Sequence, residues 1–113
     1  MIEAAGTLVP SKSDILEVTD NSKGLKPVVG DYWAALLISD GGRGARLLPA
    51  IEERATDAGW VEQYRCDVVS GIQLGYRRDD FKVDVSVRTL KDPVTAFISI
   101  QRVGDGNPWP PEC

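Results

Sequence analysis

Side chains that could carry out chemistry are few in this chain, because its 113 residues include no histidine and only two cysteines, Cys66 and Cys113. Without histidine, a serine or cysteine nucleophile lacks its usual general base, and no serine stands in a GxSxG pattern. Metal ligation is equally poor in candidates, since there is no CxxC pair. We therefore expect a protein that is not an enzyme and that has no metal site and no cofactor.

The two cysteines are candidates for a disulfide. Cys66 lies in a segment of alternating apolar and polar residues, where it is either a small core residue or one half of a disulfide. Cys113 follows a rigid proline-rich segment, an unusual place for an idle thiol. A bond between them would close a loop of about 48 residues, which the chain-entropy estimate values at about 4 kcal/mol. Two free thiols are the alternative.

Four residues are candidate contacts for a protein partner: Trp109, Pro110, Arg77 and Arg78. The Pro-Trp-Pro-Pro tail favours the polyproline II conformation, which an aromatic groove on a partner could bind. Alternatively, Trp109 packs on the edge of the domain and Cys113 anchors the tail. The two arginines precede two aspartates, and such a cluster is more typical of a solvated turn than of a calcium or partner site.

The glycine-rich segment 39–44 lies where a phosphate-binding loop would lie, between a predicted strand and a helix. The GxxxxGK[ST] pattern fails, because Ala45 and Arg46 stand where Lys and Ser or Thr are needed. The GxGxxG pattern fails at Leu47, which replaces its third glycine. We interpret this segment as a connector.

Charge and hydropathy exclude further classes of protein. The chain has 13 basic and 17 acidic residues, a net charge of −4, and no basic stripe, which argues against nucleic acid and anionic membranes as partners. No run approaches the roughly 18 apolar residues of a membrane span. The first six residues do not resemble a signal peptide, so an export leader would lie outside this sequence.

The residues that could position these side chains show two periodicities. Apolar residues recur at helical spacing over 45–58, with Leu47, Leu48, Ile51 and Ala55 on one stripe. Pro49 is best tolerated in the first turn, so we expect the regular helix to begin near residue 48. From residue 61 onward the period is two, which predicts four antiparallel strands around residues 64–68, 72–76, 81–88 and 94–101.

Two earlier segments are candidates for further strands. The first candidate is the segment of residues 15–19. The apolar run 32–38 is either a strand or a helix by periodicity, and its length and flanking glycines favour a strand. The sequence therefore predicts a two-layer α+β fold, with one amphipathic helix packed on an antiparallel sheet of five or six strands that ends in a four-strand meander.

The expected organisation is a flexible leader at 1–13, a single α+β domain at 14–103 and an extended proline-rich tail at 104–113. The predicted core consists of apolar residues from the helix and strands: Trp33, Leu36, Leu48, Ile51, Ala55, Trp60, Tyr64, Ile72, Leu74, Phe81, Val83, Val85, Val87, Ile98 and Ile100.

The segment that ends in Ala58-Gly59-Trp60, followed by the strands around Gly75–Val83, resembles small cell-envelope proteins of actinobacteria, many of them lipoproteins. The resemblance covers roughly residues 45–103. The lipid-anchoring cysteine of such proteins is absent here. Few of them have an assigned activity, so the resemblance implies a compartment and not a reaction.

Together these observations predict a non-enzymatic binding or interaction domain outside the cytoplasm, in the cell envelope or secreted, with a partner that the sequence does not identify. The alternative is a cytosolic acidic inhibitor or immunity-type protein that binds a basic partner protein, as its size and net charge suit. A small enzyme that works without histidine, through Asp or Tyr, is the third possibility. Nothing in the sequence indicates the oligomeric state.

Overall fold

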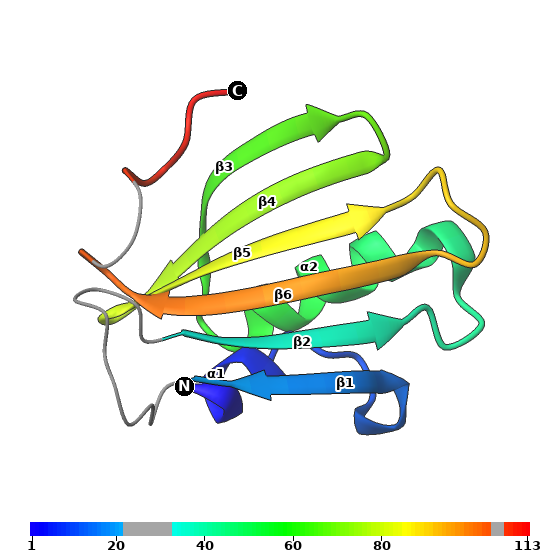
Figure 1. Cartoon of the computed structure of the whole chain (residues 1–113), viewed down its shortest axis with the longest axis horizontal. Helices are drawn as coiled ribbons and strands as arrows, with labels where there is room; N and C mark the ends of the chain where they lie inside the picture. The colour runs from blue at the N-terminus through cyan, green and yellow to red at the C-terminus, as the bar shows by residue number, and fades with distance from the viewer. Residues whose placement is uncertain (22–32, 105–107) are drawn as a thin grey trace.

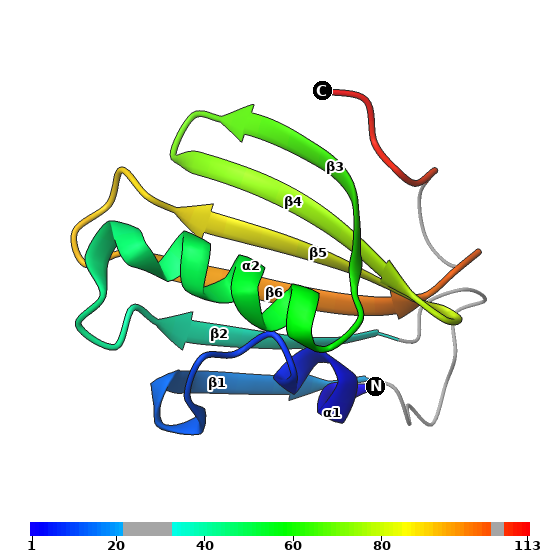
Figure 2. The same cartoon turned by 180° about the vertical axis from the view of Figure 1, so that it is seen from behind.

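A six-stranded antiparallel sheet with both helices on one face forms the fold (Figures 1 and 2). The computed structural model describes residues 1–21, 33–104 and 108–113. The strand order is β1-β2-β6-β5-β4-β3. The strands are β1 (Ile15–Asp20), β2 (Trp33–Ser39), β3 (Val61–Val68), β4 (Gly71–Arg78), β5 (Phe81–Arg88) and β6 (Thr95–Arg102), and the helices are α1 (Ile2–Gly6) and α2 (Leu47–Asp57).

The predicted α+β fold and the C-terminal meander of β3 to β6 are confirmed. In β5, Val83, Val85 and Val87 are buried beneath the helices, while the residues between them face the opposite side of the sheet. Strand β2 lies between β1 and β6, so the apolar run predicted at residues 32–38 forms a strand and not a helix. Tyr32, its first predicted residue, lies outside the described residues.

Helix α2 covers the middle of the sheet, as Figure 2 shows. It continues from a short 3-10 turn at Gly44–Arg46, and Pro49 is its third residue, where no intrahelical donor is lost. Leu47, Ile51 and Ala55 form the buried stripe. The helix is followed by Gly59, whose φ of +83° favours glycine.

The structure corrects the prediction of a flexible leader at residues 1–13. Residues 2–6 form α1, and Ala5, Leu8 and Val9 are buried in the main core. Trp60 Nε1 donates a hydrogen bond to Thr7 Oγ1 at 2.9 Å, which attaches this segment to the residue that follows α2. The segment is too short to show a clear period, and only its burial shows that it belongs to the core.

The structure also corrects the predicted orientation of Tyr64 and Cys66, which were expected on the core face. The pairing of β3 with β4 shifts between Glu62 and Tyr64, so Tyr64 pairs with Gly75 instead of Leu74. One extra residue in a strand turns the following side chains to the other face. Both residues therefore lie on the helix-free face.

The rest of the core prediction is largely correct. Leu48, Ile72 and Phe81 are only partly buried and pack against the core. The prediction of Trp33 as a core residue is wrong, because Trp33 alternates with the core residues of β2 and lies on the helix-free face, paired with Gln101. Among the described residues, no helix is long and apolar enough to cross a membrane.

Candidate binding site

Three rows of side chains cross the helix-free face of the sheet, because paired residues on antiparallel strands point to the same side. The first row is Gln73, Ser86, Phe97 and Leu37. The second is Gly75, Asp84, Ser99 and Ala35, and the third is Arg77, Lys82, Gln101 and Trp33. Neighbours within a row are about 5 Å apart.

The middle row is made of shorter side chains than most of those in the two rows beside it, in which Ser86 is the exception. Asp84 and Ser99 form its centre, with Gly75 at one end and Ala35 at the other. This difference in length produces a trough that crosses the strands. We call it the central trough, with Asp84 and Ser99 as its floor.

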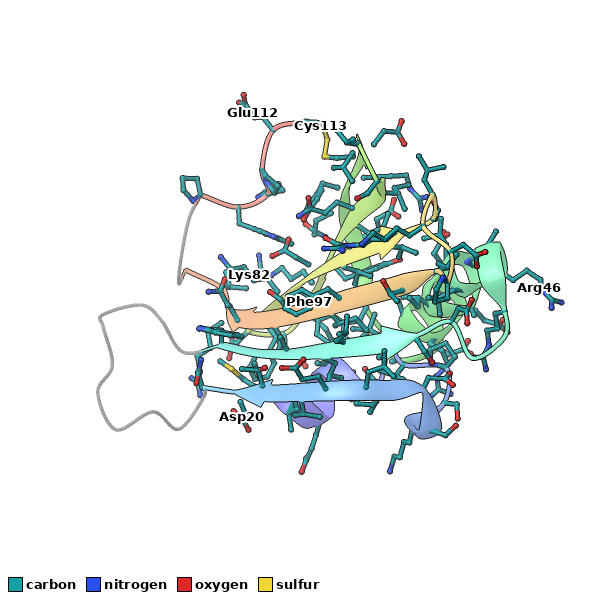
Figure 3. The ribbon with its side chains drawn as sticks, turned by 45° about the vertical axis from the view of Figure 1, so that its right-hand side comes forward. Asp20, Arg46, Lys82, Phe97, Glu112 and Cys113 are labelled. Carbon is teal, nitrogen blue, oxygen red and sulfur yellow. A yellow bond between two sulfur atoms is a disulfide. The ribbon has the colours of Figure 1, made fainter. Side chains whose placement is uncertain are left out.

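The tail closes the Gly75 end of the central trough. Cys113 forms a disulfide with Cys66 of β3, so the predicted pairing is present, and Figure 3 shows it as a yellow bond. Four residues before Cys113, the Trp109 ring packs edge-on against the Tyr64 ring of β3, with the two centroids 5.9 Å apart. Trp109 Nε1 donates a hydrogen bond to Asp84 Oδ1 at 2.9 Å.

Gly75 makes this packing possible. The Tyr64 ring lies where a side chain at position 75 would begin, and Trp109 Cζ2 would be only 3.0 Å from an added Cβ atom. Glycine in a strand often marks such a close approach. The bulge in β3 and the glycine in β4 therefore act together to place two aromatic rings on the sheet.

Asp84 is the centre of a hydrogen-bond network. Its Oδ1 accepts from both Tyr64 and Trp109, and Gln73 Nε2 donates to the Tyr64 hydroxyl oxygen at 3.1 Å. Burial, and then the bond to Asp84, raise the pKa of Tyr64 above its usual value of 10. Tyr64 is therefore a neutral donor at physiological pH, which fixes its orientation and makes it unsuitable as a general base.

Lys82 gives the trough its positive charge. Its side chain is only 3% exposed, and its ammonium group lies 5.9 Å from the Trp109 ring centroid. A lysine stem commonly covers apolar surface in this way. Figure 3 labels Lys82 on β5 and Phe97 on the neighbouring strand β6.

The trough contains an open hollow of about 460 Å³, a volume within the range of small-molecule sites. Its lining combines polar side chains of the sheet with rings of the sheet and tail: Gln73, Lys82, Asp84, Ser86, Phe97, Ser99, Gln101, Pro108, Trp109 and Pro111. A second hollow of about 540 Å³ shares Phe97 with the first and includes Leu37, Arg88 and Thr95. The binding surface therefore continues along the sheet beyond Phe97.

The residues predicted as partner contacts do not form one surface. Trp109 lies in the trough, and Pro110 is exposed in the tail. Arg78 faces the helix side, where Nη1 donates to the Ala58 carbonyl oxygen at 3.0 Å and the guanidinium lies 4.6 Å from the Trp60 ring centroid. Arg77 is exposed on the helix-free face.

The glycine-rich loop is not arranged to bind phosphate. Asp40 accepts hydrogen bonds from the backbone N–H groups of Gly42 and Gly44, at 3.0 and 3.2 Å. These are donors that a phosphate group would need. Arg43 forms an ion pair with the buried Asp14 at 2.7 Å, so the loop is held by its own Asp40 and by Asp14 from the segment before β1.

The sequence analysis did not identify most of the site, because Lys82, Asp84 and their neighbours are simply the polar positions that alternate with the core residues of the strands. The available signal was the row of short residues, which becomes visible once the four strands are paired through their turns. Among the described residues, no group of three or more acidic or cysteine side chains is placed to hold a metal ion. Comparisons with protein-family models, curated proteins and solved structures find no match for this chain.

Proposed function

We propose that this protein is a non-enzymatic domain that acts outside the cytoplasm and binds a ligand in the central trough. The observation that carries the proposal is the way the disulfide-anchored tail places Trp109 at the end of the trough, in contact with Asp84 and Tyr64. A tail held this way forms a wall for a site on a sheet face that has no helix.

The compartment follows from the same feature. Disulfides persist in oxidising environments and are rare in the cytosol. The disulfide joins the tail to the sheet, so the end wall of the trough is expected to depend on an oxidising environment. The resemblance to actinobacterial cell-envelope proteins supports the same compartment.

A binding role fits the chemistry of the lining better than a catalytic one. Tyr64 is held protonated, and one oxygen of Asp84 is already occupied by two donors. What the trough does present is a set of hydrogen-bonding groups on the sheet, with one aromatic ring in a side wall and another in the end wall. Such convergent polar groups in a mixed cavity are typical of ligand sites.

The test is a two-dimensional NMR titration of the isotopically labelled protein with the low-molecular-mass fraction of culture medium from its native host. We expect the Asp84 amide and the Trp109 indole signals to shift. Ser99→Trp should fill the trough and abolish these shifts, with Ser99→Leu as a second blocking variant. Ser13→Trp is the matched control, because Ser13 is exposed at a distance from the trough.

The proposal is contradicted if no trough signal shifts with any fraction. It is equally contradicted if the shifts are the same in the trough-filled variants, since binding would then take place elsewhere on the molecule.

A further inference from the structure

We infer that the ligand of the central trough is a neutral oligosaccharide, an inference that rests on the proposed function. A sugar ring presents hydroxyl groups around its edge, which both donate and accept hydrogen bonds, and C–H groups on its faces, which pack against aromatic rings. The trough offers both kinds of partner in one place.

The polar lining is matched to a ligand rich in hydroxyl groups. Gln73 and Gln101 each donate and accept, the hydroxyl groups of Ser86 and Ser99 do both, and the Asp84 carboxylate only accepts. In the described part of the chain the hydrogen bonds to Asp84 converge on Oδ1, which leaves Oδ2 to accept from a ligand. Two adjacent hydroxyl groups of a sugar can bind together to the Asp84 carboxylate of β5 and to a glutamine amide on a neighbouring strand.

The charge balance argues against strongly ionic ligands. Among the described residues, the lining contains one ammonium group, that of Lys82, and one carboxylate, that of Asp84, so these residues together contribute no net charge. The Asp84 carboxylate would repel a phosphate-rich ligand, and the Lys82 ammonium group would repel a polycation. The chain as a whole has a net charge of −4, which adds to the penalty for an anion.

The aromatic rings are placed for the faces of a sugar. Phe97 is 44% exposed, and it lies two residues from Ser99 on β6, about 7 Å along the strand. Phe97 therefore stands in a side wall of the trough, whereas Trp109 forms the wall at its Gly75 end. A sugar ring that rests on Asp84 and Ser99 can therefore contact aromatic carbon at one side wall and at the end wall.

The position of the trough argues against an extended peptide. Peptides that bind to sheets add a strand at an exposed edge, where backbone groups are unpaired. The trough crosses β4, β5 and β6, which are interior strands whose backbone groups already pair with neighbours on both sides. Recognition here must use side chains, as it does for sugars. The adjoining hollow beyond Phe97 gives room for more than one sugar ring.

The experiment is an NMR titration of the oxidised full chain with cellobiose, maltose and chitobiose, followed separately by inorganic phosphate and trialanine. We expect at least one disaccharide to shift the Trp109 indole signal and the Asp84 and Ser99 amides in the millimolar range. Phe97→Ala should weaken that binding by about three- to tenfold, the equivalent of one aromatic contact. Leu90→Ala, at a residue that is 79% exposed and not among those that line the trough, should bind as the wild type does.

Two results overturn the inference and also separate it from the proposed function. If trialanine or phosphate shifts the trough signals and no disaccharide does, the ligand is not a sugar, although the trough is a binding site. If none of these probes shifts the trough signals, the sugar inference fails, and the proposed function then depends on the titration with native culture medium.

Discussion

Gly75 is the residue on which the wall of the trough most directly depends. The Tyr64 ring occupies the space where any side chain at this position would begin, and Trp109 packs beside it. The network around Asp84 depends on the same two rings. Two consequences at the scale of single residues can be measured.

Gly75→Ala should destabilise the protein by about 1–3 kcal/mol, because the new methyl group forces Tyr64 and Trp109 off the sheet. Urea unfolding measures the change, and near-ultraviolet circular dichroism reports the displaced rings. Gly6→Ala is the matched control, since an added Cβ atom there meets nothing within 4 Å. Equal stability of the Gly75→Ala variant and the wild type would show that Tyr64 does not lie over Gly75.

Stability should fall at alkaline pH because of the buried tyrosines. Burial, and then the nearby Glu52 and Glu62, raise the pKa of Tyr76 from 10.0 to about 12. A group whose pKa is higher in the folded state stabilises the fold fully below its unfolded value and loses that contribution as the pH rises through its folded value. Tyr76 should therefore contribute about 3 kcal/mol near pH 9, most of it lost by about pH 12.

The pKa of Tyr64 is also raised, so this residue adds to the loss with the same sign. Urea unfolding of the wild type, Tyr64→Phe and Tyr76→Phe between about pH 9 and about pH 12 measures the effect. Each variant should show a shallower decline than the wild type. Parallel curves for all three proteins would contradict the raised pKa values.

At the scale of elements, α1 and the segment after it belong to the core. Leu8 is fully buried, and Trp60 donates to Thr7 across the segment. Leu8→Ala should therefore cost about 2–5 kcal/mol in unfolding free energy. Leu90→Ala removes the same atoms from an exposed turn and should stay within about 0.5 kcal/mol of the wild type. Similar small effects for both variants would indicate that residues 1–13 form a flexible leader, as the sequence predicts.

The elements also show how far the sequence can be interpreted. The four strands of the meander and the main helix could be predicted, because their periods of two and about 3.6 extend over enough residues. The orientation of Tyr64 could not be predicted, because a single extra residue in β3 reverses the faces without changing the pattern of residue types. Asp84 and Ser99 could not be identified either, because only the pairing of the strands and the position of the tail show that these two polar residues belong to one site.

The whole molecule depends on a connection between its tail and its sheet. The disulfide joins residues 47 positions apart in the sequence and holds Trp109 above the sheet. The double variant Cys66→Ser/Cys113→Ser should lose about 4 kcal/mol of stability, in the chain-entropy account. Urea unfolding measures this, and reduction of the wild type should reproduce it. If neither treatment changes the stability, the tail makes no structural contribution.

The same treatments should open the end of the trough. Without the disulfide the tail loses its covalent attachment to β3, so the hydrogen bond from the Trp109 indole to Asp84 should be populated for less of the time. Hydrogen exchange of the indole N–H measures this directly. We expect slow exchange in the oxidised protein and faster exchange in the reduced one, whereas equal rates would mean that Trp109 is held without the disulfide.

The central claim is that the protein functions with its tail bonded to the sheet, outside the cytoplasm. The most direct test is the intact mass of protein isolated from its native host and alkylated with and without prior reduction. We predict no alkylated thiol without reduction and two after it, with Cys66 and Cys113 in one disulfide-linked peptide. Two alkylated thiols in the unreduced protein would contradict the account and would favour a cytosolic acidic inhibitor instead.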